Sequence, residues 1–256
     1  VWDQLLTHTG SWVTRSVLRG IGPARQSCSF WFADLCRLPT PFPPLVSGGP
    51  HGPFHFTLLA SIFLLREVEA ANTLASSWTF SHSALELTWL LPASKCDHLA
   101  RGTRRTWGCL CAVPDLCCPY HVALSYWAWY SNSCFCRPGV DGPLFPSAAG
   151  VAPGKAAVIA TFEAIGSLLG QPLITESGIR AFGGHTARVT GAQALATIGI
   201  DINKIRILAR HSGDTILRYV ADTPLRSLRA DLFTLSARSV VGASRAAGTS
   251  AMVLSR

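Results

Sequence analysis

Apolar residues occur along the whole chain in segments that are too short to cross a membrane as a helix. Hydrophobic residues make up 48% of the 256 residues and charged residues only 14%. The longest apolar stretch, from Phe54 to Leu65, contains His55 and continues into Arg66 and Glu67, whereas a membrane-spanning helix needs about 20 apolar residues. A chain of this size and composition buries its apolar side chains in its own core, so we expect neither extensive disorder nor a membrane partner.

Arginine carries almost all of the positive charge. The chain has 22 Lys and Arg and 14 Asp and Glu, which gives a net charge of +8, and its only lysines are Lys95, Lys155 and Lys204. Eleven basic and five acidic residues lie between positions 176 and 256. Because the planar guanidinium group makes bidentate contacts with phosphate, this composition favours a polyanionic partner such as nucleic acid.

Three regions differ in composition and periodicity. Residues 1–53 contain two Pro/Gly-rich stretches and predict one or two short helices followed by an extended linker. Residues 54–236 carry periodic patterns, and 237–256 predict a flexible tail. The chain starts at Val1 without a secretory signal, so we expect an intracellular protein whose sequence begins inside a longer reading frame.

The periodic region predicts an α+β fold that is mainly α. Helical patterns cover 54–74, 119–130, 154–169, 186–198, 202–210 and 214–221, and strand-like patterns cover 77–91 and 103–111. Asp201 is a suitable N-cap for the helix that follows it. We therefore expect a helical bundle with a small antiparallel β-sheet.

Polar residues that fall inside helical patterns indicate a functional site. His185 and Arg188 are three residues apart and share one face at the start of a helix, where backbone N–H groups also favour an anion. An unpaired buried charge costs several kcal/mol, so such residues need partners. A second histidine, His211, precedes Tyr219 by eight residues. These four residues predict a site for an anionic group.

The arrangement resembles the tyrosine recombinases, the phage-integrase type of DNA strand-transfer enzyme. In that family an H-x-x-R helix is followed by a His or Trp and then by a nucleophilic Tyr in the next helix. His185, Arg188, His211 and Tyr219 match these positions in order. The resemblance covers about residues 54–225 and implies a catalytic domain that is a helical bundle with a small sheet.

Two further motifs of the family can be found upstream. Its first arginine lies in a helix as L-R-x-x-E, which fits Arg66 with Glu69 as a supporting residue. Its lysine, which protonates the departing 5′ oxygen, lies in a hairpin after the first strand, and Lys95 fits that position. The resemblance implies an enzyme that cuts and rejoins double-stranded DNA through a covalent 3′-phosphotyrosine, needs no metal for catalysis, and forms a homo-oligomer on DNA.

Two departures from the common pattern refine the resemblance. The interval from His211 to Tyr219 is eight residues where most phage and bacterial members have nine, and Arg210 occupies a position where they usually have Gly. Both features are similar to recombinases of the DIRS group of eukaryotic retroelements. The family's helical DNA-clamping domain would precede residue 54, and residues 1–53 are too short for a complete copy. We therefore expect a mobile-element enzyme that acts in the nucleus and has a truncated front end.

The chemistry of strand cleavage also requires these residue types. Attack of Tyr219 on a phosphodiester builds negative charge on the non-bridging oxygens, which Arg66 and Arg188 would bind. His185 and His211 would add donors, and His185 could accept the phenolic proton as a general base. An unperturbed Tyr has a pKa of about 10 and is a poor nucleophile at neutral pH without such help.

A cysteine cluster lies between the strand and helix patterns. Cys109, Cys111, Cys118 and His121 offer thiolate and imidazole groups at short spacing and could hold a structural zinc. C-x-C-x6-C-x2-H is not a standard zinc-knuckle spacing, and buried free cysteines are the alternative. The nine cysteines without a secretory signal indicate intracellular thiols or a metal site rather than a disulfide framework.

Two other functions remain open at this point. The chain could be a catalytically inactive DNA-binding remnant of a mobile element, or a nucleic-acid-binding module that the zinc cluster stabilises. A covalent protein–DNA adduct would distinguish the enzyme from both. Tyr126 and Tyr130 are the next candidates if Tyr219 is not the nucleophile.

Overall fold

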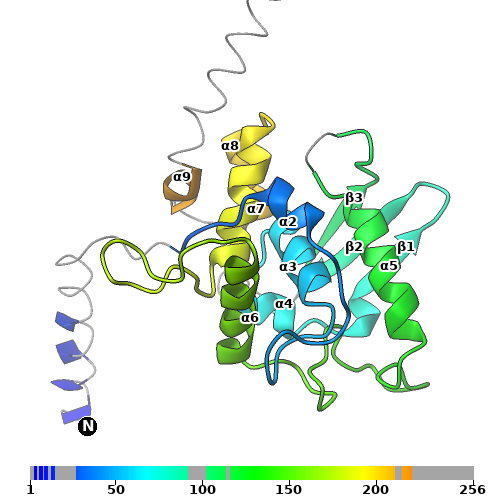
Figure 1. The fold of residues 1–256 in the computed structure, drawn as a ribbon, viewed down its shortest axis with the longest axis horizontal. Coiled ribbons are helices and arrows are strands. Elements are labelled where there is room, and N and C mark those ends of the chain that lie inside the picture. Colours follow the sequence, from blue (N-terminus) through cyan, green and yellow to red (C-terminus); the bar gives the residue numbers. More distant parts are fainter. Residues whose placement is uncertain are drawn as a thin grey trace, which may run out of the picture.

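The described residues form a mainly helical body with one small β-sheet (Figure 1). The computed structural model describes residues 27–91, 102–113, 116–210 and 215–220, together with several helical positions between residues 3 and 14. The elements after that first helix are α2 (Phe32–Arg37), α3 (Pro53–Ile62), α4 (Glu67–Ala71), a 3-10 turn (Ala75–Ser77), β1 (Trp78–Ser81), β2 (Glu86–Leu91), β3 (Thr103–Gly108), α5 (Pro119–Ser131), α6 (Lys155–Leu168), α7 (Thr186–Thr197), α8 (Ile202–Leu208) and α9 (Thr215–Val220). The expected α+β class, mainly α with a small antiparallel sheet, is confirmed.

The sheet has the strand order β1-β2-β3, and both strand pairs are antiparallel. Leu87, Trp89 and Leu91 alternate along β2 and are fully buried, whereas Thr88 and Thr106 share a hydrogen bond on the exposed face. One face of the sheet therefore packs on the core. The strand-like pattern predicted over 77–91 corresponds to two strands in the structure, β1 and β2, because the chain turns tightly between them.

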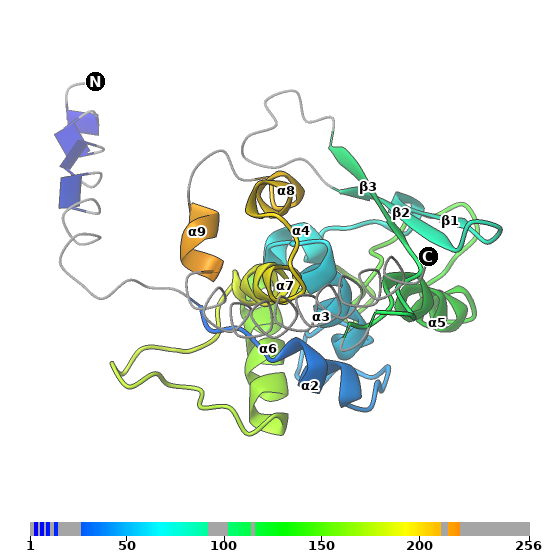
Figure 2. The ribbon, with the colours of Figure 1, turned by 90° about the horizontal axis from the view of Figure 1, so that it is seen from above.

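Helix α3 is the centre of the molecule and is buried along its whole length. Figures 1 and 2 show α3 between α7 on one side and α5 on the other, and both of these helices contact it. Helix α7 approaches α3 very closely at Gly191, where a Cβ atom would collide with the carbonyl group of Ser61. The α3–α7 contact fixes the relative positions of the segments that carry the candidate site.

The helix expected over 54–74 is interrupted, which corrects the sequence-based prediction. Leu64 adopts a left-handed conformation with φ 54°, which costs a non-glycine residue about 1–2 kcal/mol. Arg66 then becomes the N-cap of α4, and its backbone N–H donates to the Glu69 carboxylate at 2.9 Å. Arg66 therefore lies at the start of a helix rather than within one, and the capping contact stabilises the break.

The described part of the Pro/Gly-rich segment packs on the helical body. Phe30 and Leu35 are buried in the main core, and the backbone N–H of Phe30 donates to Thr190 of α7 at 2.9 Å. Residues 27–53 thus share their core with the helices that follow. None of the helices in the described ranges is both long enough and apolar enough to span a bilayer.

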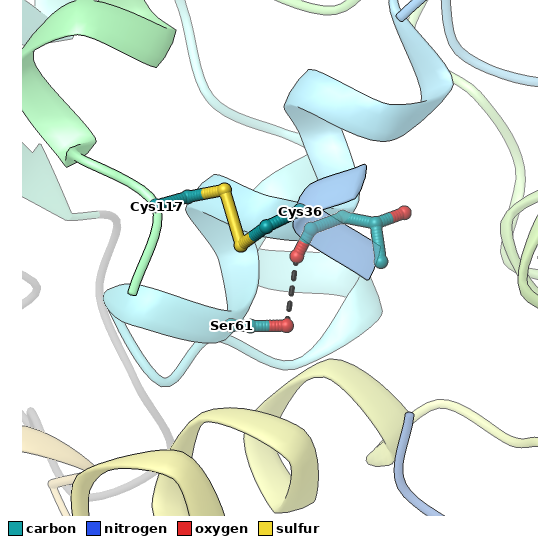
Figure 3. Close-up of a disulfide and its surroundings, with 4 residues drawn as sticks. Cys36, Ser61 and Cys117 are labelled. Atoms are coloured by element: carbon teal, nitrogen blue, oxygen red, sulfur yellow. Dashed lines mark hydrogen bonds between the residues drawn. A yellow bond between two sulfur atoms is a disulfide. The ribbon is translucent and has the colours of Figure 1, made fainter. Parts of the chain in front are cut away.

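A disulfide connects α2 to the segment before α5 (Figure 3). Cys36 and Cys117 are 81 residues apart in the sequence and 5.7 Å apart between Cα atoms. Figure 3 also shows Ser61 of α3, whose hydroxyl donates to the carbonyl oxygen of Thr57 at 2.8 Å. The expectation that the cysteines are thiols or metal ligands is therefore wrong for this pair, since the fold brings together two residues whose positions in the sequence carry no sign of pairing.

Gly191→Ala tests the close approach of α3 and α7. Alanine normally stabilises a helix relative to glycine, but here the added methyl group must push α7 away from Ser61. We expect the free energy of unfolding to fall by about 1–3 kcal/mol, as for other overpacked cores. Urea denaturation measures this change. Gly154→Ala is the control, because nothing lies within 4 Å of its added methyl group; a Gly191→Ala protein as stable as this control would contradict the packing.

Candidate active site

Three guanidinium groups converge on the carboxylate of Glu69. Arg66 Nη2 lies 2.7 Å from Glu69 Oε1, while Arg188 Nη2 and Arg210 Nη2 lie 2.7 and 3.0 Å from Oε2. Only 3% of Glu69 is exposed. Burial alone would raise the pKa of Glu69, but the arginines, Arg188 first among them, outweigh it and hold the pKa below its usual value. One buried negative charge thus faces three positive charges, which leaves an excess of positive charge at the site.

The interruption between α3 and α4 also positions Arg188. Arg188 Nε donates to the carbonyl oxygen of Leu64 at 2.7 Å, and its Nη2 donates to Glu69. The left-handed Leu64 therefore provides one of two contacts that fix the plane of this guanidinium group, which has five N–H donors in all. With the residue only 4% exposed, the fixed donors of this planar group suit an oxyanion such as phosphate.

The phenol of Tyr219 lies against the imidazole of His185. The Tyr219 Oη atom is 3.0 Å from His185 Nδ1. His185 is the residue just before α7, and Tyr219 belongs to α9, which packs along α7. Gln193 of α7 donates to the backbone oxygen of Tyr219 at 2.9 Å. If the phenol donates this bond, the imidazole carries its own proton on Nε2.

Burial shifts the pKa values of His185 and Tyr219 in opposite directions, and both shifts favour the neutral form of the side chain. Burial lowers the pKa of His185, and Arg188 lowers it further, although Glu67 acts in the opposite direction. The imidazole is therefore neutral near pH 7 and can accept a proton. Burial raises the pKa of Tyr219, and Arg188 and Arg66 offset only part of that rise. The phenol keeps its proton at rest and needs a base such as His185 to become a nucleophile.

The structure adds two charged residues that the sequence analysis did not assign to the site. Arg210 follows α8 in a left-handed conformation with φ 56°, and its guanidinium group contacts Glu69. Glu67 is buried and its backbone N–H donates to the oxygen of Gly184 at 3.0 Å. A Cβ atom at Gly184 would collide with the Glu67 carboxyl group. The glycine directly before His185 was the available signal of this close approach.

Most of the predicted site residues that the structure describes come together. Arg66, Glu69, His185, Arg188 and Tyr219 form one cluster, although they belong to segments far apart in the sequence. Lys95 and His211 lie outside the described residues. The β2–β3 hairpin is confirmed on both sides of the connection that contains Lys95, since β2 and β3 pair along their length.

The four predicted metal ligands also come together, as a separate cluster. The ligand atoms of Cys109, Cys111, Cys118 and His121 all lie within 4.8 Å of one another. These residues flank the connection from β3 to α5. The set could hold a metal ion.

Comparison with known proteins identifies the fold but no close relative. No protein-family model and no curated protein matches the sequence. Among solved structures, the chain is similar to the XerH site-specific recombinase bound to palindromic difH substrate, with 18% identity, a TM-score of 0.50, and coverage of 70% of this chain and 44% of the XerH chain. It is also similar to the Tn1549 transposon integrase in complex with a circular intermediate DNA, with 14% identity, a TM-score of 0.44, and coverage of 71% and 58%.

The chain spans less than half the length of the XerH chain. The match to XerH agrees with the mainly helical body and the three-stranded antiparallel sheet described above. The described residues therefore have the fold of a tyrosine recombinase catalytic domain.

Proposed function

We propose that this chain is a tyrosine recombinase that cleaves and rejoins DNA through a covalent bond between Tyr219 and a 3′ phosphate. The observation that carries the proposal is the contact of the Tyr219 phenol with His185 at 3.0 Å, next to an arginine cluster with excess positive charge. The fold supports it, and the XerH site-specific recombinase, which shares that fold, was solved bound to its difH substrate in a post-cleavage complex.

The reaction needs one proton transfer at the nucleophile. The phenolic oxygen of Tyr219 forms a bond to phosphorus while its proton passes to Nδ1 of His185, and the bond between phosphorus and the 5′ oxygen breaks. The pKa of His185 is lowered chiefly by burial, so the neutral base is available at physiological pH. Rejoining reverses these steps: a 5′ hydroxyl attacks the phosphotyrosine, and Tyr219 recovers its proton.

The arginines stabilise the charge that develops on the phosphate. Arg66 and Arg188 are directed by Glu69, and Arg210 adds a third positive charge to the same carboxylate. Donors that are already fixed need no rearrangement when the charge appears, which is the main source of electrostatic catalysis. Glu69 is thus a positioning residue. The positive charge that catalysis requires comes from these side chains, and His211 would add a further donor.

The leaving oxygen needs a proton of its own. We assign this role to Lys95, which lies outside the described residues in the connection between β2 and β3. A hairpin is a suitable carrier for a general acid that approaches the phosphate from the side opposite to the nucleophile. Without such an acid, the 5′ oxygen would leave as an alkoxide.

The environments of the four tyrosines favour Tyr219 as the nucleophile. The other three belong to α5. Burial raises the pKa of Tyr126 and Tyr130, as it does that of Tyr219, but no arginine offsets the rise for these two. The Tyr126 hydroxyl donates to the Leu144 oxygen at 2.8 Å. Tyr120 contacts His82 instead. Tyr219 is the one whose phenol interacts electrostatically with Arg188 and Arg66.

We also propose that the enzyme belongs to a eukaryotic mobile element. The eight-residue interval between His211 and Tyr219 and the arginine before His211 favour a DIRS-like mobile element. Such an enzyme would act on chromosomal DNA in the nucleus, as a homo-oligomer on the duplex. A DNA-binding remnant without activity is the second candidate, and it predicts DNA binding without any covalent adduct.

Tyr219→Phe removes only the attacking oxygen. We expect the covalent adduct on a nicked suicide substrate to fall to background, while the Kd for DNA changes by less than about threefold, which is under 1 kcal/mol. Denaturing gels measure the adduct and fluorescence anisotropy measures binding. Tyr120→Phe is the matched control and keeps the adduct. An adduct at wild-type level in Tyr219→Phe would assign the nucleophile to another residue, and no adduct with the wild-type chain would favour the inactive remnant.

Glu69→Gln keeps the shape of the side chain and removes its charge. We expect the free energy of unfolding at pH 7 to fall by about 3–5 kcal/mol, the usual cost of breaking a buried ion pair. The pKa of Glu69 is lower in the folded chain than in the unfolded chain. Its contribution is therefore complete above the unfolded value of about 4.3 and declines as the pH falls through the folded value.

Urea denaturation between about pH 7 and pH 3 measures this dependence. Glu163→Gln is the matched control, since it removes a carboxylate whose partner Arg180 is largely exposed, and such pairs contribute less than about 1 kcal/mol. Equal losses of stability in the two variants would show that the Glu69 cluster does not hold the site together.

Lys95→Ala separates the general-acid role from simple charge attraction. We expect cleavage of ordinary DNA to slow by about 10²- to 10⁴-fold, the usual contribution of a general acid. A 5′-bridging phosphorothiolate substrate has a leaving group that needs no proton, so its cleavage should return to near the wild-type rate. Arg188→Ala is the comparison and should stay slow on both substrates, because its defect concerns the non-bridging oxygens. Equal defects of Lys95→Ala on both substrates would exclude the general-acid role.

A further inference from the structure

The cluster of Cys109, Cys111, Cys118 and His121 is separate from the residues that we assign to strand cleavage. We propose that these four side chains bind one zinc ion, which attaches the end of β3 to the start of α5. The proposal goes beyond DNA cleavage and is independent of it. It depends on the distances between the ligand atoms, on their chemistry and on the elements that carry them.

The ligand atoms have the spacing of a tetrahedral zinc site. His121 Nδ1 is 3.2 Å from the sulfur atoms of Cys111 and Cys118 and 3.7 Å from that of Cys109. The sulfur atoms of Cys109 and Cys118 are 3.7 Å apart. Zinc bonds of about 2.3 Å to sulfur and 2.0 Å to nitrogen place tetrahedral ligands about 3.5–3.8 Å from one another. These four distances thus lie within about 0.3 Å of the tetrahedral values, and the two remaining sulfur–sulfur distances, both to Cys111, are at most 4.8 Å.

The backbone presents these residues from both sides of one loop. Strand β3 ends at Gly108, and Cys109 and Cys111 follow it directly. Cys118 is the N-cap of α5, and His121 lies three residues later on the same face of that helix. The backbone N–H of Leu110 donates to the Cys118 sulfur at 3.3 Å. Such amide donors orient a ligating sulfur and partly compensate the charge of a thiolate.

The donor set favours zinc among the common metals. Three thiolates and one imidazole are soft or borderline ligands, and a tetrahedral set of this kind is typical of structural zinc. Hard cations such as Mg²⁺ and Ca²⁺ prefer oxygen ligands. Four protein ligands leave no open position for a substrate, so the ion would have a structural role.

The neighbouring cysteines are excluded by their own contacts or positions. Cys117 is bonded to Cys36 of α2 (Figure 3), while Cys134 and Cys136 follow the opposite end of α5 and are exposed. The short segment that leads into α5 would thus be attached in two directions, to α2 by the disulfide and to β3 by the ion. Strand β3 pairs with β2, so the ion would also fix the base of the hairpin whose connection contains Lys95.

Zinc content measured on the purified full chain tests the site. We expect one equivalent of zinc by elemental mass spectrometry, and replacement by Co²⁺ should give the visible absorption of a tetrahedral cobalt–thiolate centre. Cys109→Ser and Cys118→Ser should lose the zinc, whereas His121→Cys should keep it because a fourth thiolate preserves the donor set. Cys134→Ser and Cys136→Ser, at the opposite end of α5, are matched controls that should bind zinc as the wild-type chain does.

Removal of the metal from the wild-type chain tests the site without any substitution, so it gives an answer even when a ligand variant fails to fold. A strong chelator should lower the thermal midpoint, and added Zn²⁺ should restore it. Three results would overturn the proposal: a wild-type chain that binds neither Zn²⁺ nor Co²⁺, zinc retained in full by Cys109→Ser, or an intact mass that shows Cys109 and Cys118 oxidised to a disulfide.

Discussion

The site depends on the ion pairs that the buried carboxylate of Glu69 makes with three arginines. Arg66 precedes α4, Arg188 belongs to α7 and Arg210 follows α8, and each contacts this one residue. Without the negative charge, three cations would repel one another in a region with little water. With it, they are held at fixed distances and still carry more positive than negative charge. The same contact thus stabilises the packing of three helices and prepares a place for an anion.

The close packing of α3 and α7 provides the frame for this cluster. Gly191 lets the two helices approach, and the chain reversal at Leu64 turns a carbonyl group toward Arg188. The phenol of Tyr219 reaches His185 because α9 packs on the same helix. Apolar packing therefore fixes the distances between these helices. Those distances determine which polar side chains can contact one another.

The sequence predicts those parts of the fold that depend on local signals. Periodicity located most helices, and the side chain of Asp201 caps α8 as expected by accepting from two backbone N–H groups. The order of His185, Arg188 and Tyr219 predicted residues that the structure brings together. The interruption of the 54–74 helix could not be predicted in the same way, because one contact that favours it joins Leu64 to a residue 124 positions away. The disulfide of Cys36 and the role of Arg210 also arise from such distant contacts.

The position of Tyr219 in the chain has a consequence for synthesis in the cell. A ribosome makes Arg66 and Arg188 before it makes α9, so α7 can pack on α3 and both arginines can contact Glu69 while Tyr219 has not yet left the ribosome. The contact of Tyr219 with His185 forms last, once α9 has packed on α7. The order of synthesis therefore places the arginine cluster before the pair of Tyr219 and His185.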